Sequence, residues 1–302
     1  MTPRVCMDPA LLIFHVRPAR RRALSTATAE ATCLLRDLGA AVAPGGPLSE
    51  QGGVFWLTLP ADALERARDR LPRLGYSYAV DLVEPTEDEG DVRWRGRSYR
   101  LARLHEEDAG ELREAAPDRR TFVLESGGEA RPVRGYRGGS GPLSRRGLPV
   151  IDARMLVNLV ATLPGATLLD PFAGAGGVVL EGLTSGYRVL SCDVDPSLRH
   201  GLRALGAAHC VADAQSLPFE SSSVDAIATE PPYEPEADEA VVTALGEMAR
   251  VLRPGGRIAL LLADRQVGAL RTRSASFGLR AFHDAPIDRK GTPCVVLAWE
   301  KA

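Results

Sequence analysis

Residues 169–177 read Leu-Asp-Pro-Phe-Ala-Gly-Ala-Gly-Gly, and they lie where an apolar stretch gives way to a helical pattern. The stretch at 166–170 predicts a buried strand, and the one at 176–186 predicts a helix. Glycines at such a junction let the chain turn tightly and leave no side chain between the backbone and a ligand. This sequence therefore predicts a ligand-binding loop at the end of a strand.

The same alternation of strands and helices continues on both sides of this loop. Further strands are expected at 187–195, 209–213, 224–230 and 257–264. Helices are expected at 151–163, 197–206 and 237–256, and a terminal hairpin at 278–286 and 292–300. This spacing predicts βαβ units around a parallel sheet covered on both faces. Ligands of such sheets bind beyond the carboxyl ends of the strands.

Three carboxylates follow three successive predicted strands: Asp170, Asp193 and Asp213. Asp170 would repel a pyrophosphate but suits an ammonium group, such as that at the methionine end of S-adenosylmethionine. Asp193 lies where a ribose diol is expected, and Asp213 can accept a hydrogen bond from an adenine amino group. Each acid alone is typical of a turn or a helix cap. The three together predict a site for S-adenosylmethionine.

The fourth predicted strand is followed by Glu230-Pro231-Pro232-Tyr233. Two prolines favour an extended turn whose carbonyl groups are free, because proline has no N–H to donate. The Glu230 carboxylate and the Pro231 carbonyl can together hold an amine by accepting two hydrogen bonds, and Tyr233 can form a wall beside it. We therefore expect Glu230, Pro231 and Tyr233 to be the catalytic residues. A proline-rich turn without a ligand is the alternative for this tetrapeptide on its own.

Together these motifs resemble those of class I S-adenosylmethionine-dependent methyltransferases that modify amino groups, whose fourth motif is usually Asp/Asn-Pro-Pro-Tyr. The closer resemblance is to the tRNA guanosine-N2 methyltransferases of the THUMP-associated group. In that family a helix reading roughly LDARLLVNLA precedes a DPFxGxGG loop. Here residues 151–159 read IDARMLVNL and residues 170–177 read DPFAGAGG. The resemblance covers residues 133–302.

The resemblance implies a Rossmann-like, seven-stranded class I methyltransferase sheet with S-adenosylmethionine as cofactor. The residues that it implies for cofactor binding are Asp170, Phe172, Gly174, Gly176, Asp193 and Asp213. Glu230, Pro231 and Tyr233 are implied to hold the acceptor amine. The sequence departs from the family twice: Glu230 stands where the family has Asp or Asn, and the first 125 residues show no recognisable THUMP domain.

Charge after the fourth strand bears on the substrate. Five carboxylates fall within ten residues, at 230, 234, 236, 238 and 239. An anionic rim would repel a phosphate backbone and attract a cationic amine. The expected substrate-binding residues are Glu230, Tyr233, Glu234, Glu236 and Asp238. As an alternative, Glu236, Asp238 and Glu239 favour the N-terminus of the next helix through its dipole.

The leading hypothesis is therefore an N-methyltransferase for a small cationic amine, an aminoglycoside or aminosugar of antibiotic biosynthesis. It resembles the gentamicin-type aminoglycoside N-methyltransferases in general character. Glu230 would bind the ammonium group and accept the proton that it must lose before methyl transfer. The first alternative is tRNA guanosine-N2 methylation, which makes nucleic acid a less favoured partner. The second is a non-catalytic module that binds S-adenosylmethionine or S-adenosylhomocysteine.

The 302 residues with a net charge of −2 suffice for two domains. We expect an α+β accessory domain at 1–125, a linker at 126–149 and the methyltransferase domain at 150–302. The first domain is expected to have strands at 10–16 and 53–59 and helices at 27–40 and 61–76, and it is a candidate contact for another protein. Five scattered cysteines and five histidines without ligand spacing predict no metal site. No apolar run suits a membrane helix, so we expect a cytoplasmic protein.

Overall fold

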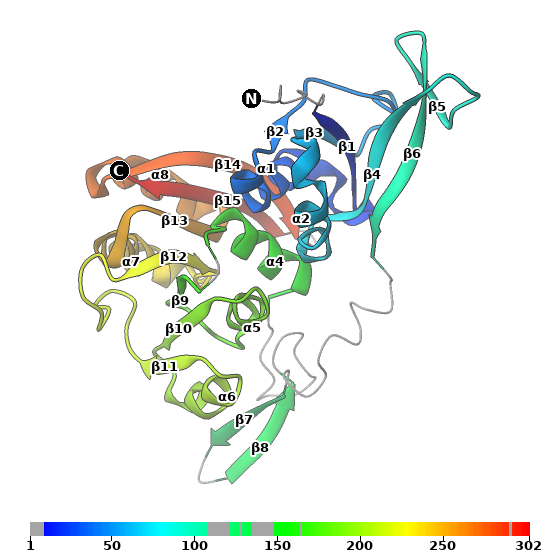
Figure 1. Cartoon of the computed structure of the whole chain (residues 1–302). Helices are drawn as coiled ribbons and strands as arrows, with labels where there is room; N and C mark the ends of the chain where they lie inside the picture. The colour runs from blue at the N-terminus through cyan, green and yellow to red at the C-terminus, as the bar shows by residue number, and fades with distance from the viewer. Residues whose placement is uncertain (1–8, 108–120, 127–128, 135–147, 164, 290–291) are drawn as a thin grey trace, which may run out of the picture. The chain divides into compact units, whose positions relative to one another are not determined.

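The computed structural model describes residues 9–107, 121–126, 129–134, 148–163, 165–289 and 292–302. The chain divides into two compact units, residues 1–111 and residues 112–302. Each unit is built around its own sheet (Figure 1).

The second unit contains a seven-stranded sheet in the order β11-β10-β9-β12-β13-β15-β14. Its strands are β9 (Thr167–Asp170), β10 (Arg188–Asp193), β11 (Ala208–Val211), β12 (Val224–Thr229), β13 (Leu252–Ala263), β14 (Leu279–Arg289) and β15 (Thr292–Lys301). The five strands from β11 to β13 are parallel, while β15 runs antiparallel to both β13 and β14. The order reverses between β9 and β12, which is where ligands of such sheets bind. The predicted Rossmann-like fold is confirmed.

The helices of this unit lie before, between and after the parallel strands. Helix α4 (Val150–Leu159) precedes β9, while α5 (Gly177–Thr184), α6 (Arg199–Ala204) and α7 (Asp238–Val251) follow β9, β10 and β12, and α8 (Val267–Ser274) follows β13. Helix α4 packs on α5, and α7 packs on α8. The predicted helix at 237–256 ends at Val251 instead, because residues 252–256, which include Pro254, begin β13.

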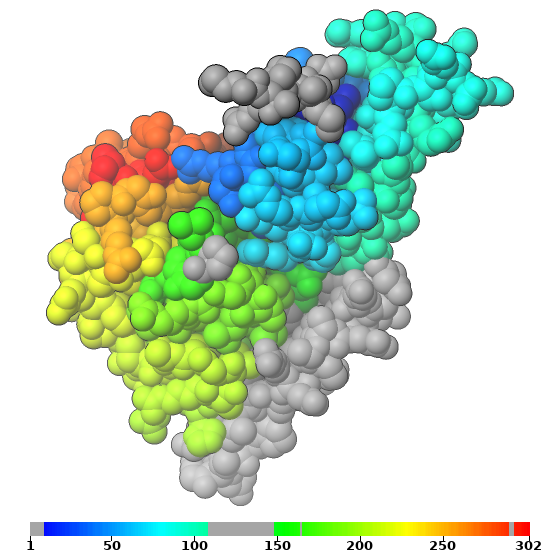
Figure 2. All heavy atoms as spheres, in the orientation of Figure 1, coloured from blue at the N-terminus to red at the C-terminus, as the bar shows by residue number. Residues whose placement is uncertain are grey.

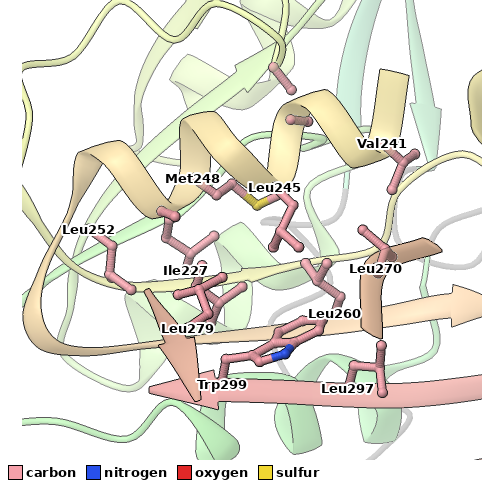
Figure 3. Close-up of a cluster of buried hydrophobic side chains, with 14 of the residues drawn as sticks. Ile227, Val241, Leu245, Met248, Leu252, Leu260, Leu270, Leu279, Leu297 and Trp299 are labelled. Carbon is pink, nitrogen blue, oxygen red and sulfur yellow. The ribbon is translucent and has the colours of Figure 1, made fainter. Parts of the chain in front are cut away.

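The core of the second unit lies where α7 covers the sheet. Leu245 and Met248 point from α7 toward Ile227, Leu260 and Trp299 on the strands below (Figure 3). All five side chains are almost completely buried. Burying each one contributes about 1.5–3 kcal/mol, so this contact fixes β12 and β13 and the loops that follow them.

The first unit has a six-stranded sheet in the order β2-β3-β1-β4-β6-β5. Its elements are β1 (Ala10–Val16), α1 (Leu24–Leu34), β2 (Ala41–Val42), β3 (Val54–Leu59), α2 (Leu64–Arg68), β4 (Ser77–Thr86), β5 (Val92–Trp94) and β6 (Arg97–Glu106). Every pair of neighbouring strands is antiparallel. The first four strands and two helices follow the ferredoxin-like βαββαβ pattern. In the space-filling view, the β5–β6 end of this sheet stands out from the body of its unit (Figure 2).

Two expectations for the first half of the chain need correction. The predicted helix at 61–76 is instead the short α2 between two 3₁₀ turns, and the second turn contains Pro72, which has no N–H to donate. The segment at 126–149, expected to be a linker, contains β8 (Glu129–Arg134), which pairs with β7 (Thr121–Ser126). Residues 135–147 of that segment lie outside the described residues.

Within the described part of the chain, every helix is too short or too polar to cross a membrane. In the same part, His, Cys, Asp and Glu side chains do not gather in threes that could hold a metal ion.

Candidate functional site

The glycine loop lies between β9 and α5, at the carboxyl end of the sheet. Gly174 and Gly176 have φ angles of 47° and 77°, in the left-handed region that residues with a Cβ rarely adopt. The Gly174 amide donates to Asp193 Oδ2 at 2.8 Å, and the Ala173 amide donates to the carbonyl of Cys192 at 2.9 Å. The loop is thus held by backbone and carboxylate contacts to the end of β10.

Asp170 is the last residue of β9 and is 2% exposed. The Thr229 hydroxyl donates to its Oδ1 at 2.6 Å, and the Phe172 amide donates to the same oxygen at 3.3 Å. Burial raises the pKa of this carboxyl to about 7, because desolvation disfavours the charged form more than these hydrogen bonds favour it. Both bonds from the described residues end on Oδ1, which leaves Oδ2 for a cation such as an ammonium group.

Asp193 and Asp213 lie at the ends of the next two strands. In the register of the sheet, Asp193 pairs with Val211, the last residue of β11, and Asp213 follows two residues later. Asp193 also accepts the amide of Asp195 at 3.0 Å, and Asp213 accepts the amide of Gln215 at 2.9 Å. The structure therefore brings the three predicted carboxylates to one edge of the sheet, where Asp193 and Asp213 also shape their own loops.

The Glu-Pro-Pro-Tyr turn follows β12, the neighbour of β9. The Tyr233 hydroxyl donates to Glu230 Oε1 at 2.6 Å. Pro231 is buried, and the Pro232 carbonyl accepts a hydrogen bond from the Gln266 side chain at 2.9 Å. Burial and the Glu230 carboxylate both raise the pKa of Tyr233, so its hydroxyl stays protonated and donates.

Arg289, which sequence reasoning missed, completes this cluster. Its Nη1 donates to Glu230 Oε1 and also to the Tyr233 hydroxyl, at 3.0 Å. Its Nε lies 3.3 Å from Oδ2 of the fully buried Asp152 in α4. Burial alone would lower the pKa of Arg289, but the facing Glu230 and Asp152 carboxylates outweigh it and raise the pKa. Glu230 therefore already accepts a hydrogen bond from a charged side chain of the protein itself, the Arg289 guanidinium.

The acidic loop after Tyr233 carries less unpaired negative charge than its sequence alone predicts. Asp238 begins α7 and lies 3.2 Å from Arg265 Nη2, which also donates to the Tyr233 carbonyl. Glu234 and Glu236 are exposed. Glu236 lies in the first turn of a 3₁₀ helix at Pro235–Ala237, and Asp238 and Glu239 lie in the first turn of α7, as the helix-dipole alternative predicts. The expected rim of free carboxylates needs correction, because arginines distant in sequence pair with two of the five.

Phe172 is half-buried and packs against the core cluster beneath the loop. Its amide binds Asp170, as described above. Its side chain therefore supports the first strand end, whichever part of a ligand it contacts.

Comparison with known proteins agrees with this geometry. Residues 169–260 match the family model described as a methyltransferase domain. A tRNA (guanine(10)-N2)-dimethyltransferase of Methanothermobacter thermautotrophicus is 34% identical over 87 residues, which cover 27% of this chain and 26% of that protein. A U6 snRNA (guanine-N2)-methyltransferase of Bos taurus is 33% identical over 144 residues, covering 44% of this chain and 29% of that protein.

Other similar proteins are methyltransferases named for acceptors other than RNA. A demethylmenaquinone methyltransferase of Beutenbergia cavernae is 31% identical over 114 residues, covering 37% of this chain and 47% of that protein. A solved geranyl diphosphate methyltransferase aligns with a TM-score of 0.41 and 18% identity, over 50% of this chain and 77% of that chain. The chain spans less than half the length of the curated relatives named here.

Three observations indicate the same kind of domain. They are the parallel sheet with its antiparallel final strand, the glycine loop after β9 and the match to the family model. The second unit of this chain therefore has the Rossmann-like fold of class I methyltransferases, and residues 169–260 within it match a methyltransferase domain, for which S-adenosylmethionine is the cofactor.

Proposed function

We propose that this chain transfers a methyl group from S-adenosylmethionine to the exocyclic amino group of guanine in RNA. The observation that carries the proposal is the pairing of Glu230 with Arg289 beside Tyr233. The similarity of the domain to guanine-N2 methyltransferases of tRNA and snRNA supports the same substrate class.

A cationic amine is disfavoured by this pairing. An ammonium group that approaches Glu230 also approaches the Arg289 guanidinium, and two like charges at about 4 Å repel by about 1 kcal/mol in water and about 4 kcal/mol near a protein surface. A neutral amino group has no such conflict and can donate a hydrogen bond to the carboxylate, which has several lone pairs. The aminoglycoside expectation has no support among the relatives compared above, and Glu230 Oε1 already pairs with the Arg289 guanidinium.

The residues at the sheet edge fit S-adenosylmethionine. Asp170 Oδ2, to which no hydrogen bond from the described residues is directed, suits its ammonium group. Glycines at 174 and 176 leave the loop without side chains where the backbone must approach a ligand. Asp193 would accept hydrogen bonds from the ribose and Asp213 from the adenine amino group. When bound, this cofactor supplies a methyl group on a sulfonium sulfur.

The acceptor side is assigned to the turn after β12. Glu230 and the Pro231 carbonyl would hold the amino group by accepting a hydrogen bond from each of its two N–H groups. This would leave the nitrogen lone pair directed at the methyl carbon. Tyr233 keeps Glu230 in place and forms the wall beside the base. The nitrogen would form a bond to the methyl carbon as the bond from that carbon to sulfur breaks, which leaves S-adenosylhomocysteine. It would then lose one proton, which Glu230 accepts and releases to water.

The test is a transfer assay with methyl-labelled S-adenosylmethionine and three kinds of acceptor: bulk tRNA, an snRNA transcript and a panel of aminoglycosides. The label is expected in RNA, as N2-methylguanosine after digestion to nucleosides. Glu230→Gln should lower kcat about 100-fold, whereas Glu220→Gln, at an exposed carboxylate that precedes β12, should not change it. Label in the aminoglycosides alone would overturn the proposal, and cofactor binding without transfer to any acceptor would favour a binding module.

A further inference from the structure

We infer that Arg289, held by Asp152, is a positioning residue and specificity determinant: it orients Glu230 for a neutral amino group and takes the place of a substrate cation. The inference deepens the proposed function and rests on its assignment of Glu230 to the acceptor side. It also explains why the helix before the glycine loop carries an acid at its first turn.

Three separate segments meet at this arginine. Asp152 comes from α4, Arg289 is the last residue of β14, and Glu230 follows β12. The guanidinium offers Nε to Asp152 and Nη1 to Glu230 and Tyr233, so one planar group fixes both carboxylates. The orientation of Glu230 is thereby coupled to the placement of α4.

Burial indicates that the pairing does more than stabilise the fold. The Asp152 side chain is 0% exposed and the Arg289 side chain is 19% exposed. Ion pairs withdrawn from water contribute little net stability, since desolvation offsets their attraction. What such a pair does provide is one defined geometry, and here that geometry ends on the carboxylate assigned to the acceptor amine.

The same helix offers a matched control. Arg154 Nε lies 3.1 Å from Glu181 Oε2, a half-buried pair that joins α4 to α5. That pair uses the same side-chain chemistry two residues from Asp152, but it is directed at α5. Changes at Arg154 and Glu181 therefore report the structural cost of losing an ion pair of α4.

The kinetic experiment compares Arg289→Met, Arg289→Lys and Asp152→Asn with Arg154→Met and Glu181→Gln, after thermal melting has shown which variants are folded. Arg289→Met should lower kcat for the acceptor about 100-fold, the loss expected when a reacting group is misplaced by about 1 Å, with the Kd for S-adenosylhomocysteine unchanged. Arg289→Lys should recover part of kcat, because lysine keeps the charge but not the planar fork. Asp152→Asn should lower kcat more than Glu181→Gln does. Equal losses in the Arg289 and Arg154 variants would overturn the positioning role.

A binding experiment tests the specificity role without any turnover. Spermidine, as a probe cation, is titrated by calorimetry into the wild type, Arg289→Met and the double variant Arg289→Met/Glu230→Gln, each saturated with S-adenosylhomocysteine. Affinity should rise at least ten-fold in Arg289→Met and return to the wild-type value in the double variant. Equal affinity in the wild type and Arg289→Met would contradict the inference.

The two proposals fail in distinguishable ways. If the wild type does not methylate RNA but Arg289→Met gains the spermidine site, the substrate assignment is wrong and the role of Arg289 stands. If the wild type methylates guanine in RNA but Arg289→Met matches Arg154→Met in kcat and the wild type in spermidine affinity, the inference is wrong and the proposed function stands. If Arg289→Met does not fold, Arg289→Lys and Asp152→Asn carry the kinetic comparison.

Discussion

Cofactor binding should depend on pH through the buried Asp170. The pKa of this carboxyl is raised to about 7, chiefly by desolvation, so a large part of it is neutral in the cofactor-free protein near pH 7. An ammonium group paired with Oδ2 requires the carboxylate form. Binding should therefore expel the proton, and affinity should fall as the pH drops below 7.

The size of the effect follows from the pKa. If the bound carboxyl stays ionised down to pH 5.5, the apparent Kd rises by 1 + 10^(7 − pH), which gives a roughly 16-fold weaker binding at pH 5.5 than at pH 7.0. That ratio corresponds to about 1.6 kcal/mol. This range lies below the usual pKa of an α-amino group, about 7.7–8.0, so the ligand's ammonium remains charged throughout.

Calorimetric titration with S-adenosylhomocysteine measures this directly, because buffers with different ionisation heats report the protons released. About one proton should be released per ligand at pH 5.5 and about half a proton at pH 7.0. Asp170→Asn is the control, and its weaker binding should lose this pH dependence. A Kd that is the same at both pH values, with no proton release, would refute the assignment of Asp170 to the ammonium group.

Three further predictions concern stability. In the cofactor-free protein, Asp170→Asn should be more stable than the wild type by up to about 4 kcal/mol at pH 8 and by little at pH 4. The reason is that a folded pKa above the unfolded value makes wild-type stability fall as pH rises from about 4 to 7. Urea unfolding at both pH values measures this difference, and a difference that is the same at pH 4 and pH 8 would contradict the prediction. Leu245→Ala should lower the free energy of unfolding of the second unit by about 2–5 kcal/mol, because it leaves a cavity between α7 and the sheet, and a loss below 1 kcal/mol would contradict the packing. In the first unit, the amides of Gly75 and Tyr76 donate to the buried Glu30 carboxylate at 2.6 and 2.9 Å. Glu30→Ala should therefore speed hydrogen exchange at these two amides by about ten-fold or more, and unchanged exchange would argue against a stabilising role for these hydrogen bonds.

Much of the second unit could be predicted from local sequence. The alternation of apolar strands and helices is set by residues close together in the chain, so it predicts the parallel sheet and its glycine loop. The placement of Asp170, Asp193 and Asp213 at one edge follows from the same alternation, because carboxyl ends of parallel strands lie together. Their assignment to parts of the cofactor stays a prediction.

The charge at the acceptor side could not be predicted in this way. Arg289 is one of 37 basic residues, lies 59 positions from Glu230 and has no distinctive neighbours in the sequence. Arg265 lies 27 positions from Asp238. Counting carboxylates along a loop therefore overestimates the field that a substrate meets, because ion pairing depends on the folded chain.

The hairpin of β7 and β8 was missed for a different reason. The glycine, proline and arginine content of residues 126–149 favoured a linker, yet Gly127 and Gly128 separate two strand-like stretches, which is itself a hairpin signal. The average composition of residues 126–149 therefore masked the turn signal of the two adjacent glycines.

The central claim, that the acceptor is the exocyclic amino group of guanine, is tested most directly by replacing guanosine with inosine. Inosine lacks only that amino group. Two transcripts of the same sequence, one with guanosine and one with inosine at the modified position, are compared for methyl transfer in a single turnover. The account predicts transfer to the guanosine transcript and none to the inosine transcript; equal transfer to both would contradict it.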